Sequence, residues 1–445
     1  MVRTRSLVLA LAALAALPLA FRPALAADAT STASADTMVF RPVDEGTGAA
    51  PDSSERSVTV SATFRMGDNG ESEWLRAPIG DHLLTHPDQW RSRDRGAKSN
   101  DVSVLLDYNR ADLLRYGLWY QAQSPATMFP RLGGRLEYAT GRRRVLYGLQ
   151  LEQPLLPTAR FVAGVSMVRR TDHGDLQQTD DAENSLALLL AHEDWRDYFE
   201  REGLGAYVSW RVPDFSTVSV HVRRDDYRSL PTASHVRSWF RTDRDLRDNP
   251  AIDDGESHSV LLRLERLTRN SKQKRAGLYH WIELERSGGQ GGGDFDYTRT
   301  LADLRSILRL TPALTLSVRG VAGATLQGEL PRQRQFVIGG VDGLRAHALG
   351  SVRGDQVALV QAEYSIGLWQ LHTGGVEGGL HALVFADAGT AWYGNEKWDV
   401  GRQKFAVDGG VGLTTSDDKL RVTFARNLQD PSSKFVCAMR LTRPF

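Results

Sequence analysis

Apolar residues alternate with small or polar residues along most of this chain. Within residues 405–413 the odd positions are apolar or Gly and the even positions are small or acidic, which is the two-residue period of a β-strand whose two faces differ. The same alternation occurs in residues 132–138, 145–152, 206–211, 314–319, 358–366 and 420–424. The pattern predicts an all-β protein, either a transmembrane barrel or a soluble sandwich that turns its polar face to water.

Charge and hydropathy exclude several other classes of protein. The 55 Lys and Arg residues balance the 54 Asp and Glu residues to a net charge of +1, which disfavours nucleic acid as a partner. After the first 26 residues, no apolar run approaches the roughly 20 residues that a transmembrane helix needs. Cys437 is the single cysteine, so neither an intramolecular disulfide nor a Cys-rich zinc site is expected.

The first residues predict an export signal. Arg3 and Arg5 precede a Leu- and Ala-rich run at residues 7–20, and Ala24 and Ala26 supply small residues where a signal peptidase cleaves. A membrane anchor would need a longer apolar span. We therefore expect cleavage after Ala26.

The remaining chain divides by composition into three parts. Residues 27–56 are rich in Ala, Ser, Thr, Asp and Pro without periodicity, so we expect a disordered leader. Residues 57–110 are interpreted as a short periplasmic or plug segment. Residues 111–445 are expected to form the barrel.

The breaks between the expected strands differ in length. Short breaks fall at residues 212–215, 309–312 and 414–419, and long polar ones at 223–256 and 323–354. In outer-membrane barrels the periplasmic turns are short and the outward loops are long. Counting strands back from the C-terminus places the short breaks at one end and these long ones at the other, except that the long acidic stretch 171–184 falls among the short turns.

The chain ends on an aromatic residue. Phe435 and Met439 lie on one face of a last strand, and Phe445 follows at the same parity. A terminal aromatic resembles the signal by which bacterial outer-membrane barrels are handed to their assembly machinery. With the export signal and the alternation, it favours a transmembrane antiparallel β-barrel in the bacterial outer membrane, with the lipid bilayer and the assembly machinery as partners.

Four segments resemble a known family. Residues 335–347, 353–355, 362–364 and 385–389 are similar to the loop-and-strand signature of the bacterial surface antigen domain, the barrel of the BamA/TamA group. The resemblance is strongest over residues 294–445 and extends back to about residue 101. It implies about sixteen strands, a loop motif of Gly339, Gly340, Gly343 and Leu344, and roles in protein insertion, translocation or envelope biogenesis.

A barrel of that size has a lumen too wide for its own wall side chains to fill. We expect the loop at residues 323–354 to fold into it. Arg345 would then enter a partly desolvated space, which is costly unless the guanidinium meets a carboxylate. Asp387 and Glu363 are the expected partners, and alternation along the strand 358–366 turns Glu363 inward. On the residues alone, without the family resemblance, the favoured alternative is that Arg345 is one of many solvated loop arginines.

The sequence departs from the family pattern in two places. The family loop reads Arg-Gly-aromatic, whereas this chain has Arg345-Ala346-His347. Assembly members also carry periplasmic POTRA domains before the barrel, and the stretch from residue 27 to 100 leaves no room for one. We therefore expect a barrel without POTRA domains, which would need a separate periplasmic partner protein.

Two other functions stay open at this point, a passive or gated pore and a barrel enzyme such as a lipase or protease. No local signature of an activated nucleophile accompanies the Ser and His residues, so we expect no catalytic residue, no enzymatic activity and no cofactor. His82 and His86 lie four residues apart, but Pro87 follows directly, and no metal site is expected there.

Overall fold

The computed structural model describes residues 100–122, 128–156, 160–212, 216–240, 245–266, 277–311, 313–373, 376–394, 405–415 and 420–441. All of them belong to one compact unit of the chain. The expected signal peptide at residues 1–26, the leader at 27–56, most of the segment 57–110 with its His pair, and Phe445 lie outside the described residues.

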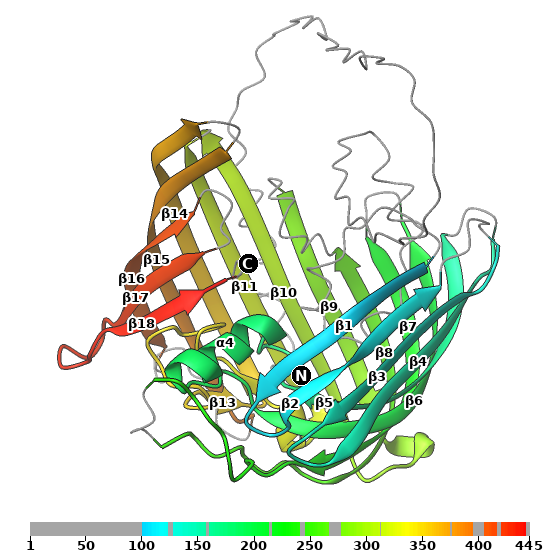
Figure 1. Cartoon of the computed structure of the whole chain (residues 1–445). Coiled ribbons are helices and arrows are strands. Elements are labelled where there is room, and N and C mark those ends of the chain that lie inside the picture. The colour runs from blue at the N-terminus through cyan, green and yellow to red at the C-terminus, as the bar shows by residue number, and fades with distance from the viewer. Residues whose placement is uncertain are drawn as a thin grey trace, which may run out of the picture. The chain divides into compact units, whose positions relative to one another are not determined.

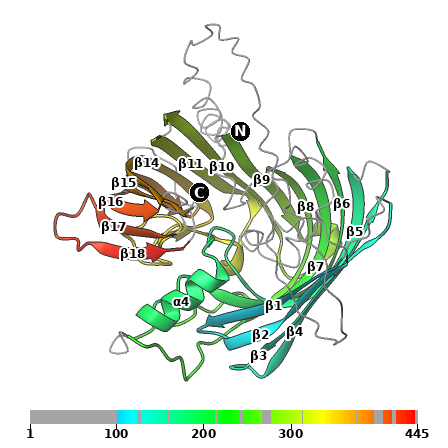
Figure 2. The ribbon, with the colours of Figure 1, turned by 45° about the horizontal axis from the view of Figure 1, so that its top comes forward.

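Sixteen antiparallel strands form one continuous sheet, in which each strand pairs with the next long strand along the chain. They are β1 (Asn100–Asn109), β2 (Leu113–Ala122), β3 (Arg131–Ala139), β4 (Arg144–Pro154), β5 (Phe161–His173), β6 (Tyr198–Arg211), β7 (Thr217–Ser229), β8 (Gly255–Arg266), β9 (Gly277–Ser287), β10 (Tyr297–Thr311), β11 (Leu314–Gly328), β14 (Gln356–Thr373), β15 (Val376–Trp392), β16 (Ala406–Thr415), β17 (Arg421–Asn427) and β18 (Val436–Arg440). Figures 1 and 2 show the sheet curving around a central space, with β1 and β18 as its two end strands. The expected antiparallel barrel of about sixteen strands is confirmed.

Side chains alternate across the wall in the sense expected for a barrel in lipid. Val208 of β6 pairs with Val220 of β7, and both are exposed on the outside. The neighbouring pair, Ser209 and Ser219, is buried on the inside. A soluble sandwich would bury its apolar face and expose its polar face, so this reversed pattern excludes it.

The structure corrects two expectations about the elements. Within the described residues the sheet already includes β1, Asn100–Asn109, so the expected boundary at residues 110 and 111 falls after a strand of the sheet. The chain also contains a helix, α4 (Asp181–Ala191), between β5 and β6. Asp180 caps it by accepting from the Ala182 amide at 3.0 Å, which satisfies one of the free amides of a first helical turn. No helix among the described residues is long and apolar enough to cross a membrane.

The strand order also corrects the placement of one connection. Because successive strands run antiparallel, the connection from β5 to β6 leaves the same end of the barrel as those from β7 to β8 and from β11 to β14. The stretch 171–184 therefore lies with the long connections, and the exception in the strand count disappears. We call this end the loop end and the opposite one the turn end.

The connection from β11 to β14 packs against the inner wall. It contains the 3₁₀ turn η3 (Arg332–Arg334) and two short paired strands, β12 (Phe336–Val337) and β13 (Arg353–Gly354); a second 3₁₀ turn, η2 (Gly289–Gly291), follows β9. Phe336, Ile338 and Leu344 of the connection bury themselves in one apolar cluster with Val321 of β11 and Leu359 of β14. This cluster holds the connection inside the barrel and positions the site described next.

Candidate functional site in the barrel lumen

Arg345 joins the inner connection to the barrel wall. Its Nε donates to Asp387 Oδ2 at 2.8 Å and its Nη2 to Oδ1 at 2.9 Å, while Nη1 donates to Glu363 Oε2 at 3.2 Å. All three side chains are buried. We call Arg345, Asp387 and Glu363 the lumen lock. The fork onto one carboxylate is the geometry in which a guanidinium binds most strongly.

The wall supplies a second arginine. Alternation along β14 and β15 turns Glu363 and Asp387 inward while Val360 and Val384 are exposed outside. Arg421 of β17 places Nη1 2.7 Å from Glu363 Oε1 and 2.6 Å from Oε2. Two cations thus face two carboxylates, which compensates the desolvation of the buried charges.

The glycine motif shapes the backbone immediately before Arg345. Leu344 donates its amide to the Ile338 carbonyl at 2.6 Å, and Gly340 donates to the Leu344 carbonyl at 3.2 Å. A Cβ on Gly343 would lie 1.9 Å from the Ile338 oxygen, and one on Gly339 would lie 2.4 Å from the Ala348 oxygen. Only glycine permits these close approaches, and they fix the fully buried Leu344 beside Arg345.

His347, which stands where the family pattern has an aromatic residue, has its own partner in the wall. Its Nδ1 lies 3.0 Å from Asp408 Oδ1, and Asp408 also accepts from the Ala346 amide at 2.7 Å. The imidazole therefore packs against β16 by a polar contact.

Asp342 ties the inner connection to the β5–β6 connection. Its Oδ2 accepts from the Gln178 amide at 2.7 Å, the Thr179 amide at 2.9 Å and the Thr179 hydroxyl at 2.7 Å. Its Oδ1 lies 3.1 Å from Arg440 Nη2 of β18. Arg319 of β11 donates to the Asp342 carbonyl at 2.8 Å. Asp342 thereby links two loops and the last strand.

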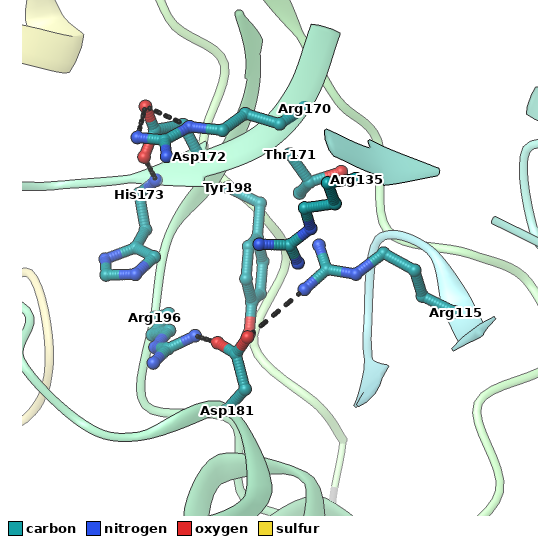
Figure 3. Close-up of a pocket in the computed structure, with 9 residues that line it drawn as sticks. All are labelled: Arg115, Arg135, Arg170, Thr171, Asp172, His173, Asp181, Arg196 and Tyr198. Carbon is teal, nitrogen blue, oxygen red and sulfur yellow. Dashed lines mark hydrogen bonds and ion pairs between the residues drawn. The ribbon is translucent and has the colours of Figure 1, made fainter. Parts of the chain in front are cut away.

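A second ionic cluster surrounds the start of α4. Figure 3 shows Asp181 between Arg196 and Arg115, at 2.5 and 3.4 Å. Arg135 and Arg170 line the same cavity of about 20 Å³, which has room for about one water molecule. Burial alone would raise the pKa of Asp181, but Arg196 and Arg115 outweigh it and hold the pKa well below its usual range.

Sequence reasoning did not find most of these charged groups. It named Arg345, Asp387 and Glu363 but not Arg421, Arg440 or Asp408, although these three are inward-facing wall charges whose positions carry a signal in the alternation. It also missed Asp342, which lies in the inner connection and has no such signal. Within the described residues no group of three or more His, Cys, Asp or Glu side chains is arranged to hold a metal ion. The buried ion pairs of this site can fix loops inside the barrel.

Comparisons with known proteins agree with this architecture. The model of the Omp85 superfamily domain matches residues 131–433. Outer membrane protein assembly factor BamA of Nitratidesulfovibrio vulgaris is 27% identical over 223 residues, covering 46% of this chain. The aligned part spans about a quarter (26%) of that relative's length.

The fold resembles that of a solved structure. The crystal structure of BamA from Haemophilus ducreyi lacking POTRA domains 1–3 aligns with a TM-score of 0.55 and 12% identity, over 77% of this chain and 70% of that one. CdiB from Escherichia coli aligns with a TM-score of 0.45 and 12% identity, over 79% of this chain and 67% of that one.

Proposed function

Because the chain belongs to the Omp85 superfamily and is a β-barrel of the bacterial outer membrane, we propose that it acts in outer-membrane protein assembly, translocation or envelope biogenesis. The proposal includes a separate periplasmic partner protein that delivers the cargo. It involves no chemical step, so no residue is assigned a catalytic role. The barrel assembly machinery is expected to insert the chain during its own biogenesis.

The lumen lock is the observation that carries the proposal against a passive pore. An open channel needs a solvated lumen, whereas here the inner connection buries Leu344 and Arg345 against the wall. Four charged side chains compensate one another there. We infer that a loop held by these buried contacts restricts free diffusion, which favours a barrel that handles cargo through its own rearrangement.

The expected partner should contact the turn end of the barrel, which faces the periplasm if the long connections face outward. Leu156 follows β4 and Leu420 precedes β17 at this end, and both are exposed. Photo-crosslinking residues placed at these two positions, in cells with an intact envelope, should capture a periplasmic protein.

The matched control is the same crosslinker at Val411, which is exposed to lipid and should give no such adduct. Reconstitution in planar bilayers distinguishes the proposed function from the alternative, a passive pore. The proposal predicts little steady conductance from the native chain. Large steady conductance together with no turn-end adduct would instead identify a pore.

A further inference from the structure

Helix α4 lies where the two end strands of the sheet approach each other. Figure 2 shows it between β1 and β18, and no ladder joins those strands among the described residues. An end strand presents backbone donors and acceptors that its sheet does not satisfy. In lipid such groups need a partner from the protein itself.

The helix binds the edge of β1 through Ser185. The backbone amide of Tyr108 donates to Ser185 Oγ at 2.8 Å. That amide points away from β2, because its bond goes to the helix. Ser185 Oγ also lies 2.8 Å from Asp107 Oδ1 and 2.7 Å from the Asp181 carbonyl oxygen, and its single proton goes to one of these two acceptors. The hydroxyl therefore accepts from an edge amide of the first strand, beside a buried carboxylate of the same strand.

The same helix binds the end of β18 through Glu183. Arg440 Nε donates to Glu183 Oε1 at 2.5 Å, and the amide of Leu441 donates to the same oxygen at 2.8 Å. The side chains of Glu183 and Arg440 are 2% and 4% exposed. A buried carboxylate thus accepts both a side-chain and a backbone donor from the last strand.

The helix is fixed in this place from the barrel wall. Asp181 in its first turn pairs with Arg115 of β2. Asn184 donates to the Tyr198 hydroxyl of β6 at 2.8 Å. Asp342 of the inner connection holds the two residues just before the helix cap. These contacts orient Glu183 and Ser185 toward the two end strands.

From this arrangement we propose that α4 is a seam latch. It joins β1 and the C-terminal end of β18 by side-chain bonds to both. A latch made of a few side-chain bonds can release without unpairing a strand ladder, and release frees the Tyr108 amide of β1 and the Leu441 amide just after β18. Such a device would serve a pore as well as an assembly protein, so it does not depend on the proposed function.

Hydrogen–deuterium exchange of the full-length protein in lipid tests the latch. Ser185→Val removes the hydroxyl. Ser185→Thr introduces a side chain of nearly the same shape as Val but keeps the hydroxyl. Loss of one hydrogen bond should speed exchange in the β1 peptide roughly two- to tenfold in the Val variant, while the Thr variant stays close to native. A Glu183→Ala/Ser185→Val double variant should speed exchange in the β1 and β18 peptides together.

Leu186→Ala is the control on the same helix, because Leu186 is exposed, and it should match the native protein. The β9 peptide, far along the strand order from both ends, should exchange at its native rate in every variant. Unchanged exchange in β1 and β18, or a uniform increase in all strands, would overturn the latch, because the helix would then contribute only general stability.

Discussion

The guanidinium carbon of Arg345 lies 3.7 Å from the centre of the Phe385 ring. Phe385 and Asp387 are two residues apart on β15, so both face the lumen. The ring therefore covers the same guanidinium whose edge forks onto the Asp387 carboxylate. A buried cation over an aromatic face is stabilised by the ring quadrupole, more so when water is excluded.

Replacing Phe385 by Leu should remove this contact while leaving the ion pairs in place. We expect a loss of about 1–3 kcal/mol in the free energy of unfolding, from the cation–π term and the smaller side chain. Urea unfolding in lipid vesicles, followed by tryptophan fluorescence, measures it. Val384→Ala at the exposed neighbouring position should cost less, and an equal cost at both positions would argue against the contact.

Gly343→Ala should disrupt the lock without removing any of its charges. The new Cβ would lie 1.9 Å from the Ile338 oxygen, so the backbone of the loop must shift, at a cost of about 1–3 kcal/mol or more. Gly134→Ala in β3 is the matched control, because its Cβ would meet its nearest neighbour at an ordinary 3.7 Å. The same unfolding assay applies, and similar stabilities for the two variants would contradict the motif's structural role.

Val411→Arg tests which face of the wall meets lipid. Val411 is 54% exposed and pairs with the exposed Val384, so a charge there should cost about 2–4 kcal/mol near mid-membrane. Leu413→Arg lies two residues nearer the turn end and should cost less. Refolding yields into vesicles report which of the two variants is more destabilised. A greater loss for Leu413→Arg than for Val411→Arg would mean that the membrane lies elsewhere on the strands. Gly410 is unsuitable as a lumen-facing comparison, because a Cβ there would lie 2.2 Å from the Phe424 oxygen.

Local sequence patterns predicted the inward direction of wall residues well. Glu363 faces the lumen and Val411 faces outward, since both follow from a two-residue period. The choice of Arg345 as the residue that meets Asp387 came from the family resemblance. Periodicity alone could not find it, because a loop residue has no parity relative to the wall.

The helix and the partners of the end strands could not be predicted in this way. The sequence count placed the connection 171–184 among the short turns, whereas the strand order places it, with the start of α4, among the long connections. Asp180 followed by acidic Asp181 and Glu183 was the available sign of a helix start. The contact of Glu183 with Arg440 joins residues 257 positions apart, so only the three-dimensional arrangement of the chain brings them together.

The lumen lock is tested most directly by a double-mutant cycle of Arg345→Ala and Asp387→Ala, measured as free energies of unfolding in lipid vesicles. Each single change leaves a buried charge without its main partner and should cost about 3–5 kcal/mol. The double variant should cost less than the two single costs added together, by about 1–3 kcal/mol. Simple additivity of the two costs would contradict the lock and make Arg345 an independent loop residue.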